Sequence, residues 1–519
     1  MILITSAKYE NPELQSEFGK IPPSFLPLGG KRLYEYQRKL FEKSDEKVVL
    51  SLSQSFKMSI SDEVKLKKLD IEILFVPDGL SLGESITYAV NMNLPISETL
   101  KILHGDTYFE SLNNSDDSVN ISLVESSYEW TYVLNDNKSL LNFKNSVDDT
   151  MKDYVLSGYF DIKNPYKFIQ ALVQTKYSFI NALIEYSKNN PISIIKNNTW
   201  LDFGLVTNYF HSKKSITTQR AFNSLVIENG YVEKSSSMVG KLDAEINWFE
   251  NFPIDLSLYI PRFYADKNGG NSYKTEYLYT STLSELYVFG KLPLHIWKKI
   301  FSSLENFLSK LHQNDTNDKN INFDYTKKTN IRIKEFVKDN NIDLNKPWIF
   351  NHQKIPSIQY IIDDLEQYLD VKNTNFKFIH GDFCFSNIMY DFKSNEIKTF
   401  DPRGRDFEDK LTVYGDERYD LAKLMHSVVG LYDFIISGFY TCKYDEYKID
   451  FKIDVTEELI LIEEEFIKIF NLKDNKEMYA IMIHLFISML PLHNDDKTKQ
   501  YALLANAFRL YNMIKKDEK

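Results

Sequence analysis

The chain has 519 residues, which is too many for one ordinary hydrophobic core, so we expect at least two domains. Its composition, 43% hydrophobic and 26% charged, is typical of a soluble globular protein, and its net charge of −11 argues against a general binder of nucleic acids or anionic membranes. Only two cysteines, Cys384 and Cys442, are present, which excludes a disulfide framework and indicates a reducing cytoplasm. No apolar run is long enough to span a membrane, and the N-terminus reads as a first strand and not as a signal peptide.

The first part of the chain alternates apolar runs with amphipathic segments. Strands are predicted at residues 2–5, 47–52, 71–76 and 100–103, and helices at residues 33–43 and 63–68 and from residue 82. This alternation predicts a mainly parallel, doubly wound α/β sheet that binds ligands beyond the carboxyl ends of its strands. Asp106 falls at such an end, although a single aspartate there is more often an ordinary turn residue.

Four segments of this half, LPLGGKRLYEYQ, ILHGDTYF, SGYFDI and TWLDFGLVTNYF, resemble the sugar-phosphate nucleotidyltransferase family in the family's order. The resemblance spans about residues 1–215 and implies a Rossmann-like, glycosyltransferase-A type mixed sheet. It implies that Mg²⁺ is bound by Asp106 and Asp202. It also implies that the nucleotide and the sugar phosphate are bound by Gly29, Gly30, Lys31, Gly83, Lys144 and Gly158.

The loop after the first strand departs from the family. The family holds the triphosphate with a Gly-rich loop and a Pro-Lys pair, whereas SAKYENPELQSEFGKIPPS has no G-x-G and has Pro23 at the position of the lysine. Lys8, Lys20 or Lys31 could supply the cation instead, and the backbone amides of the loop could still bind phosphate. An active transferase and a degenerate nucleotide-binding module both stay open for this half.

A second pattern begins near residues 213–221. An Asn229-Gly230 turn between two apolar runs predicts a β-hairpin, and a helix is predicted at residues 241–251. From residue 283 the sequence becomes mainly helical. We therefore predict domains at residues 1–217 and 218–519, the second with a small β lobe at about 218–282 and a helical lobe at about 283–519.

Four residues of the small lobe are candidates for ATP binding. Lys234 on a strand and Glu245 on the following helix match the ion pair with which kinase-like folds hold the α- and β-phosphates. A strand is predicted at residues 273–279, where kinase-like folds bind adenine, and Glu276 and Leu278 lie on it. Taken alone, a surface lysine and a solvated glutamate are the commoner interpretation, and no G-x-G-x-x-G precedes Lys234, so this is not a protein-kinase signature.

The segment from Phe376 to Arg405 has the clearest catalytic pattern. Asp382, Asn387 and Asp401 follow one another in the order in which kinase-type phosphotransferases place a catalytic Asp, a metal-binding Asn and a metal-binding Asp. A carboxylate at Asp382 can orient a substrate hydroxyl and accept its proton, and the other two offer hard oxygen ligands to Mg²⁺. Each residue alone would be a turn residue, and it is the ordered set that favours a phosphotransferase.

HGDFCFSNIMYD, FDPRG and YDLAKL resemble the aminoglycoside phosphotransferase and choline kinase superfamily over about residues 220–519. The resemblance implies an α+β, protein-kinase-like domain with the catalytic and metal-binding roles just described, and with Asp420 bracing the catalytic loop. Arg403 and Arg405 would meet either an anionic substrate or a nearby carboxylate, and the sequence does not separate the two.

Two such halves predict a bifunctional transferase. The enzyme would phosphorylate a small hydroxyl metabolite, such as a sugar or an amino alcohol, with ATP. It would then transfer a nucleotidyl group from CTP, UTP or GTP and release pyrophosphate, giving an activated precursor for capsule or other surface polysaccharide or for lipid. Mg²⁺ is the expected cofactor, the cytoplasm the expected location, and oligomerisation is left open. The alternatives are a kinase with a degenerate N-terminal domain and a non-catalytic nucleotide-sensing scaffold.

Overall fold

The computed structural model describes residues 1–516 except residues 10, 96–98, 114, 124–131, 135–141, 145–153, 217–222, 237–238, 266–271, 319 and 370–374. The chain divides into two compact units. The first is formed by Met1–Thr217 with Phe289–Lys291, and the second by Thr218–Val288 with Leu292–Lys519. Each unit is described by itself.

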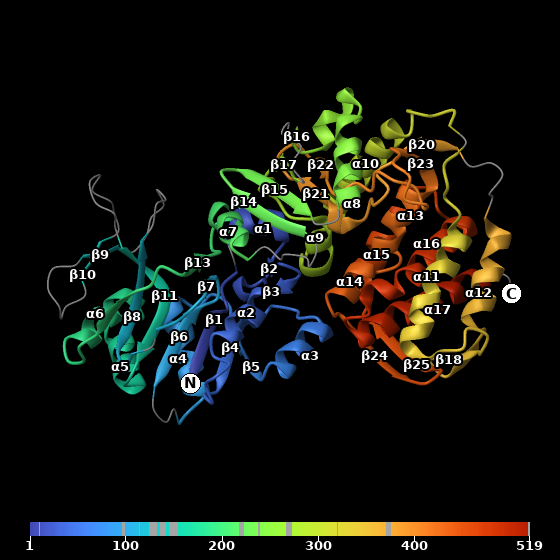
Figure 1. The fold of residues 1–519 in the computed structure, drawn as a ribbon. Helices are drawn as coiled ribbons and strands as arrows, with labels where there is room; N and C mark the ends of the chain where they lie inside the picture. The colour runs from blue at the N-terminus through green and yellow to red at the C-terminus, as the bar shows by residue number, and fades with distance from the viewer. Residues whose placement is uncertain are drawn as a thin grey trace. The chain divides into compact units, whose positions relative to one another are not determined.

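The first unit is built on a mixed β-sheet with the strand order β10-β9-β11-β6-β1-β4-β5, in which β8 pairs with β11 and β12 (Figure 1). β1 runs parallel to β4 and β6, and β4 runs parallel to β5, whereas β11 is antiparallel to β6. The mixed α/β sheet that the resemblance implied is therefore confirmed, whereas the mainly parallel sheet predicted from the alternation is wrong for the part around β11, whose pairings with β6, β8 and β9 are all antiparallel. The strands are β1 (Ile2–Ser6), β4 (Val48–Ser53), β5 (Ile71–Val76), β6 (Leu100–His104), β8 (Ser118–Leu123), β9 (Tyr132–Leu134), β10 (Asn142–Lys144), β11 (Tyr154–Ile162) and β12 (Ser193–Lys196).

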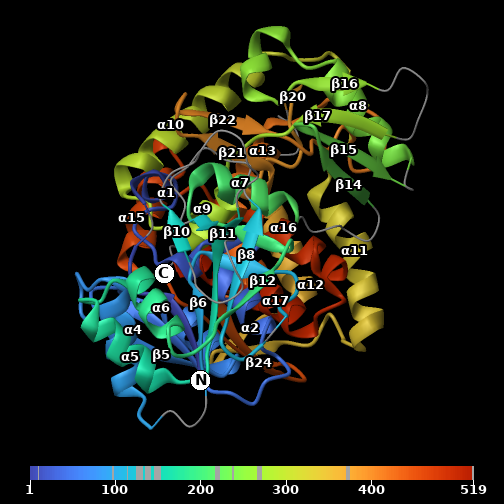
Figure 2. The ribbon, with the colours of Figure 1, turned by 90° about the vertical axis from the view of Figure 1, so that its left-hand side faces the viewer.

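Helices α4 (Leu82–Met92), α5 (Pro165–Gln174) and α6 (Phe179–Ser187) pack beside this sheet, as Figure 2 shows. Their apolar side chains recur at helical spacing and bury against strand residues such as Leu3 and Ile102, both fully buried. The remaining elements of the unit are α1 (Pro12–Phe18), α2 (Leu33–Lys39), α3 (Ile60–Lys68), α7 (Val206–Lys214), the hairpin of β2 (Pro27–Leu28) and β3 (Lys31–Arg32), and the pair of β7 (Thr107–Phe109) and β13 (Trp200–Asp202).

The second unit begins with an antiparallel sheet of β14 (Asn223–Glu228), β15 (Tyr231–Ser236), β17 (Ser272–Glu276) and β16 (Phe263–Ala265), in that spatial order. Asn229 and Gly230 both have positive φ, 50° and 79°, so the predicted Asn-Gly hairpin is confirmed. Helix α8 (Val239–Glu250) packs against β15. The predicted strand at residues 273–279 ends earlier, at Glu276.

The rest of the second unit is mainly helical, as expected. Its helices are α9 (Leu283–Phe289), α10 (Leu294–Leu311), α11 (Tyr325–Asn340), α12 (Ile358–Leu365), α13 (Glu417–Val428), α14 (Tyr432–Ile436), α15 (Glu457–Ile469), α16 (Lys476–Ser488) and α17 (Lys497–Lys516). Its strands are β18 (Trp348–Phe350), β19 (Gln353–Ile355), β20 (Phe376–Phe378), β21 (Ile388–Asp391), β22 (Glu396–Thr399), β23 (Tyr414–Asp416), β24 (Tyr440–Asp445) and β25 (Lys448–Ile453). Helix α11 and the sheet β19-β18-β25-β24 were not predicted from the sequence.

None of the helices in the described part of the chain is both long enough and apolar enough to cross a membrane.

A buried ion pair connects α3 to the start of α2 in the first unit. The Nη2 of Arg32 lies 3.0 Å from the Oδ2 of Asp62, and the two side chains are only 6% and 2% exposed. The Asp62 carboxylate also accepts hydrogen bonds from the hydroxyls of Tyr34 and Ser59. Burial alone would raise the pKa of Asp62, but the guanidinium and these hydrogen bonds together lower it, so the carboxylate stays charged.

We expect Asp62→Ala to lower the free energy of unfolding of the first unit by about 3–5 kcal/mol, because it leaves the Arg32 guanidinium buried without a counter-charge. Glu72→Ala is the matched control, since Glu72 pairs with Lys47 at 2.8 Å but both side chains are about half exposed, and it should cost less than about 1 kcal/mol. Urea-dependent hydrogen exchange in β1 and β4 measures this unit separately. Equal effects of the two variants would contradict the expectation.

Candidate active sites

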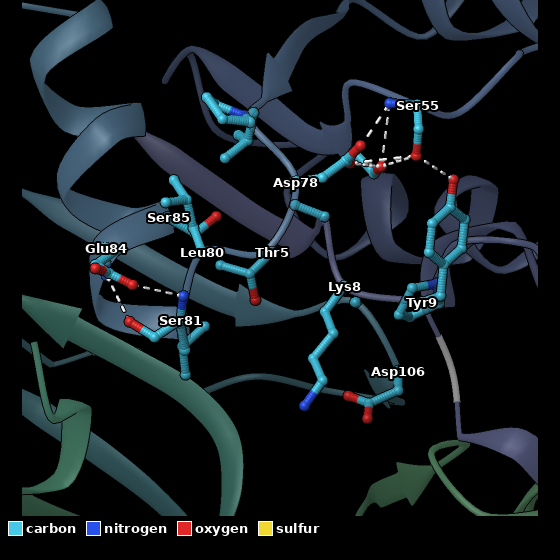
Figure 3. A pocket seen from close by; sticks show the side chains of 18 of the residues that line it. Thr5, Lys8, Tyr9, Ser55, Asp78, Leu80, Ser81, Glu84, Ser85 and Asp106 are labelled. Atoms are coloured by element: carbon cyan, nitrogen blue, oxygen red, sulfur yellow. Dashed lines mark hydrogen bonds between the residues drawn. The ribbon is translucent and has the colours of Figure 1, made fainter.

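The first candidate site is a cavity of about 1200 Å³ at the carboxyl ends of the parallel strands of the first unit. Thr5, Ser53 and His104, which lie at or near the ends of β1, β4 and β6, contribute to its lining, as does Asp106. Figure 3 shows the Lys8 ammonium pointing toward the Asp106 carboxylate. The location is the one that a doubly wound sheet favours for a ligand.

The loop that presents Asp106 is held by a buried glutamine that the sequence analysis missed. The side-chain amide of Gln37, on α2, donates to the carbonyl oxygens of Gly105 and Thr107, both at 2.9 Å. The backbone N–H of Gly105 also donates to the carbonyl of Thr5 at 2.9 Å. Because both chain neighbours of Asp106 are fixed in this way, its carboxylate is directed by the backbone of a stable loop.

The structure brings Asp106 and Asp202 together. β7 and β13 pair so that Thr107 is opposite Asp202, and the N–H of Phe203 donates to the carbonyl of Asp106 at 2.8 Å. A Cβ atom at Gly204 would lie 2.6 Å from the Asp106 carboxylate and 3.5 Å from that of Asp202. Desolvation, followed by the charge of Asp106, raises the pKa of Asp202 to about 7. Two converging carboxylates that repel each other fit a divalent cation such as Mg²⁺, whose charge would offset the repulsion.

The glycines predicted to bind ligand lie elsewhere. Gly29 and Gly30 form the turn of the β2–β3 hairpin, with φ of 56° and 77°, and Lys31 is exposed beside them. None of the three is among the described residues that line the cavity. Gly83 and Gly158 are required by the packing of the chain, since a Cβ would lie 2.2 Å from the Tyr177 carbonyl and 2.6 Å from the Thr107 hydroxyl. The side chain of Lys144 lies outside the described part of the structure. The binding roles of these residues stay predictions.

Two of the three lysines considered as substitutes for the family's phosphate-binding lysine line the cavity. These are Lys8 and Lys20, together with Pro23 at the family's lysine position, whereas Lys31 does not line it. The loop that lacks the G-x-G pattern contains helix α1, whose N-cap Asn11 also donates from its amide to the Gly204 carbonyl at 2.8 Å. A helix therefore orders this loop where the family has a Gly-rich turn.

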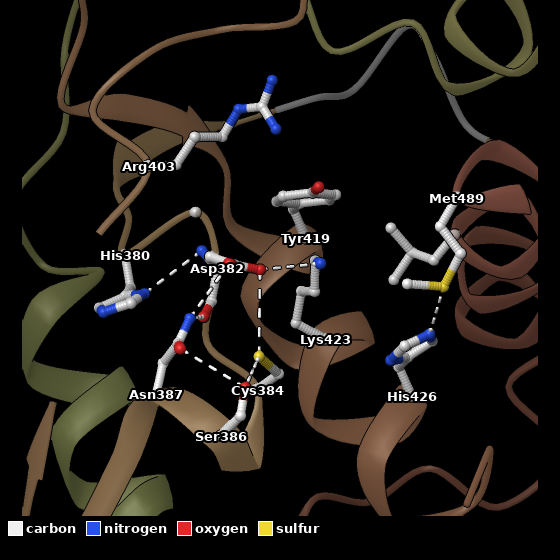
Figure 4. Close-up of polar contacts among 12 residues, drawn as sticks. His380, Asp382, Cys384, Ser386, Asn387, Arg403, Tyr419, Lys423, His426 and Met489 are labelled. Carbon is white, nitrogen blue, oxygen red and sulfur yellow. Dashed lines mark hydrogen bonds and ion pairs between the residues drawn. The ribbon is translucent and has the colours of Figure 1, made fainter. Parts of the chain in front are cut away.

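The second candidate site is centred on Asp382 in the second unit (Figure 4). Its Oδ1 lies 2.8 Å from the Lys423 ammonium, and its Oδ2 accepts a hydrogen bond of 3.1 Å from the Asn387 amide. Desolvation would raise the pKa of Asp382, but the charge and hydrogen bond of Lys423, together with the nearby His380 and Arg403, outweigh it and hold that pKa well below the ordinary value. Asp382 is therefore a fixed carboxylate that can orient a hydroxyl.

The loop around Asp382 is braced by Asp420 of α13, as the superfamily resemblance implied. The Asp420 carboxylate accepts from the backbone N–H groups of His380 and Gly381 at 2.8 and 2.7 Å. The Nδ1 of His380 accepts from the N–H of Asp382 at 3.2 Å, so its Nε2 carries the proton and donates to the Phe400 carbonyl at 3.1 Å. Burial lowers the pKa of His380, in keeping with this neutral form, so the ring holds the loop and is not a proton donor to substrate.

The predicted ATP lysine meets its partner. The Lys234 ammonium lies 2.6 Å from the Glu245 carboxylate, which also accepts from the Tyr273 hydroxyl at 2.7 Å, and it forms a second ion pair with Asp401. Lys234 and Glu245 are almost fully buried, and Asp401 has a φ of 59°, which is uncommon for a residue with a side chain. Such backbone strain is typical of functional sites.

Asn387 and Asp401 supply a suitable donor set for Mg²⁺. Asn387 precedes β21 and Asp401 follows β22, and the N–H of Phe400 donates to the Asn387 carbonyl at 3.1 Å, which ties the two segments together. The described residues contain no group of three or more His, Cys, Asp or Glu side chains arranged for a metal ion. Mg²⁺ commonly takes only one or two protein oxygens and completes its shell with phosphate and water, so the two side chains fit this cation.

Asp382 and Asp401 line one cavity of about 430 Å³, which Glu245 and Arg403 also border. Glu276 and Leu278 do not contribute to its described lining, so their adenine-binding role stays a prediction. Sequence reasoning missed three further lining residues, namely Lys328, Arg332 and Lys423. Of these, only Lys423 could have been found from the sequence, because it follows Asp420 by three positions in YDLAKL and so lies on the same side of a helix.

The structure distinguishes the contacts of Arg403 and Arg405, which the sequence could not. Arg405 forms an ion pair with Asp409 at 3.1 Å. Arg403 donates to the backbone carbonyls of Arg405 and Asp406, at 2.9 and 3.1 Å. Arg405 therefore meets a carboxylate of the protein, and Arg403 keeps its charge available to the cavity.

No protein-family model and no curated protein matches the chain. Among solved structures it is similar to a nucleoside-diphosphate-sugar pyrophosphorylase from Vibrio cholerae RC9, with 12% identity, 41% of this chain and 99% of the other covered, and a TM-score of 0.35. CTP:phosphocholine cytidylyltransferase from Streptococcus pneumoniae matches with 13% identity, 42% and 98% coverage, and a TM-score of 0.33. An aminoglycoside 2'-phosphotransferase-IIIa in its GDP complex matches with 14% identity, 58% and 92% coverage, and a TM-score of 0.36. At these identities and scores the similarities assign no activity, which has to be argued from the sites.

We expect Lys423→Met to lower the free energy of unfolding by about 1–2 kcal/mol at pH 7, because it leaves the partly exposed Asp382 carboxylate without its cation. The double variant Lys423→Met/Asp382→Asn should recover most of the loss, since no unpaired charge is left. Urea denaturation followed by tryptophan fluorescence measures both. Lys327→Met, which removes an exposed lysine, is the control, and a double variant as unstable as the single one would contradict the pairing.

Proposed function

We propose that the chain is a bifunctional transferase with domains at residues 1–217 and 218–519. The second domain transfers the γ-phosphoryl group of ATP to a hydroxyl group of a small metabolite. The first transfers a nucleotidyl group from CTP, UTP or GTP to the phosphorylated product. The observation that carries the proposal is that Asp382, Asp401 and Glu245 line one cavity and that Lys234 forms ion pairs with both Asp401 and Glu245, since kinase-type phosphotransfer needs these groups together.

In the phosphoryl step, Lys234 holds the α- and β-phosphates, with its ammonium fixed by Glu245. Mg²⁺ held by Asn387 and Asp401 would supply charge neutralisation on the phosphates. Asp382 orients the acceptor hydroxyl, whose oxygen forms the new bond to the γ-phosphorus while the bond to the β–γ bridging oxygen breaks. The hydroxyl proton passes to Asp382 and then to solvent. The low pKa of Asp382 suits a loose transition state, in which the proton leaves late.

In the nucleotidyl step, a phosphate oxygen of the phosphorylated metabolite forms a bond to the α-phosphorus of the second nucleotide. The bond to the β-phosphate breaks and pyrophosphate leaves. Asp106 and Asp202 fit the Mg²⁺ that this reaction class uses, and Lys8 and Lys20 are the cations available to the triphosphate. The product would be a nucleotide-activated precursor for capsule polysaccharide or lipid, made in the cytoplasm.

A second candidate function is a kinase whose first domain binds a nucleotide without turning it over. The observation that favours it is the loop with helix α1 in place of a Gly-rich phosphate loop, and Pro23 at the lysine position. Asp106, which lines the cavity, and Asp202, which lies close to Asp106, support the active form instead.

We expect Asp106→Asn and Asp382→Asn to separate the two activities. Asp382→Asn should lower phosphorylation by ATP at least about 100-fold and leave nucleotidyl transfer to a pre-phosphorylated acceptor unchanged, whereas Asp106→Asn should do the reverse. Phosphorus NMR follows ADP, pyrophosphate and both products in one sample. Asp116→Asn and Asp318→Asn, at exposed carboxylates, are the controls.

Three results would contradict parts of the proposal. An Asp106→Asn variant that keeps every activity favours the kinase alone. An Asp382→Asn variant that also loses nucleotidyl transfer contradicts independent sites. Binding of Mg-ATP without phosphorylation of any hydroxyl compound favours a nucleotide-sensing protein.

A further inference from the structure

Basic side chains gather beside Asp382 in the cavity of the second unit. Lys328 and Arg332 come from α11, where their spacing of four residues places them on one face of the helix, and both line the cavity. Arg403 and Lys423 line it as well, and Figure 4 shows the Lys423 ammonium paired with the Asp382 carboxylate.

Three of these cations have no acidic partner. The Lys328 ammonium lies 3.3 Å from the Tyr419 hydroxyl and 3.6 Å from the centre of the Phe407 ring. Arg332 donates to the Ser488 carbonyl at 3.4 Å, and Arg403 donates to two backbone carbonyls. Among the residues that the structure describes, no carboxylate oxygen lies within the 4.0 Å of an ion pair with any of the three.

Neighbouring basic residues on the same segments do pair with acids. Lys327, beside Lys328 on α11, lies 2.7 Å from Glu408, and Arg405 lies 3.1 Å from Asp409. Carboxylates are therefore present near these segments, but Glu408 pairs with Lys327 and Asp409 pairs with Arg405. The three unpaired cations therefore differ from their neighbours, although four carboxylates, those of Glu245, Asp382, Asp401 and Asp409, also line the cavity.

The cluster is electrostatically unfavourable by itself. Desolvation lowers the pKa of Lys328 well below its usual value, and the charges of Arg403, Arg332 and Lys423 lower it further. Like charges held together in a partly desolvated cavity repel one another, and a bound anion removes that repulsion. At these basic side chains a quaternary ammonium group would meet like charges, so the cluster does not suit a cationic group of a ligand.

In the proposed kinase step, the residues that bind the ATP phosphates are not those of the basic cluster. Lys234 and Asp401, which meet in an ion pair, hold the nucleotide side, whereas Lys328 is next to Tyr419 and Lys423 on α13. The apolar wall of the cavity comes from Leu485, Met489 and Leu492.

We propose that the acceptor of the phosphoryl group is a small hydroxyl compound that carries an anionic group, either a carboxylate or a phosphate. This rests on the kinase function proposed above. Lys328, Arg332 and Arg403 bind the anionic group, and Asp382 receives the hydroxyl. The cavity volume of about 430 Å³ suits a small molecule of this kind. Choline-type amino alcohols are then disfavoured as acceptors.

The test compares acceptors that differ only in charge. D-glycerate (a carboxylate), glycerol 3-phosphate (a phosphate), glycerol and ethanolamine form one series, and gluconate, glucose 6-phosphate, glucose and glucosamine a second. Phosphorus NMR with Mg-ATP measures phosphorylation by the full chain, and calorimetry with Mg-ADP present measures binding. We expect at least one anionic compound to bind and to be phosphorylated with a kcat/KM at least about 100-fold above that of its neutral and cationic counterparts.

Substitutions then connect the preference to the cluster. Lys328→Gln and Arg332→Gln should each raise KM for the anionic acceptor by about 10- to 100-fold, with less change in kcat and none in KM for ATP. Each variant should be at least as stable as the wild type, because a like charge is removed, so loss of folding does not explain the change. Lys328→Arg should restore binding, and Lys327→Gln, next to Lys328 but paired with Glu408, should have no effect.

The outcomes distinguish this inference from the kinase function. A preference for neutral or cationic acceptors, no binding of any anionic compound, or anion binding that survives the double substitution of Lys328 and Arg332 overturns the anionic acceptor. Anion binding that depends on Lys328 and Arg332 without phosphorylation of any compound upholds the anion site and overturns the kinase.

Discussion

The second unit depends on the pairing of charges that its fold takes out of water. A lysine as deeply buried as Lys234 is stable only with counter-charges, and it finds them in Glu245 on α8 and in Asp401 after β22. One ammonium therefore joins the small sheet, its helix and the β21–β22 hairpin, which Asp401 follows. The same requirement explains Asp382, whose charge is kept by Lys423 on α13, and Asp420, which takes up the two N–H groups of the loop. Catalytic geometry and stability rest on the same contacts.

The first unit leaves a different charge problem at its site. The β7–β13 pair brings Asp106 close to Asp202, and burial together with the charge of Asp106 raises the pKa of Asp202. No lysine is in ion-pair contact with either carboxylate among the described residues, although Lys8 points toward Asp106 (Figure 3). A divalent cation is the ligand that would relieve this repulsion, whereas in the second unit an anion relieves the crowding of Lys328, Arg332 and Arg403. The candidate site of the first unit thus has unpaired negative charge, and that of the second unit has unpaired positive charge.

Some of this could be predicted from the sequence. Strands β1, β4, β5 and β6 are short apolar runs separated by amphipathic segments, which is why an α/β sheet was predictable. The Asn229-Gly230 hairpin followed from turn chemistry, and the H-G-D and Asp401 segments were found as an ordered local pattern. Helix α11 was missed because its apolar positions are few among lysines and asparagines, and a Lys and an Arg four residues apart normally lie on a solvated face.

The sequence by itself therefore determined features that depend on near neighbours in the chain: the alternation of strands and helices, the hairpin, and the residues that carry the H-G-D pattern. The tertiary structure alone decided which charges meet. Gln37 reaches the Asp106 loop, and Lys328 and Arg332 face the Asp382 cavity, across distances in sequence that no local pattern spans. Whether a lysine is a solvated surface group or an uncompensated charge in a cavity depends on which carboxylates the fold brings within reach, because Coulomb interactions act through space and desolvation sets their strength.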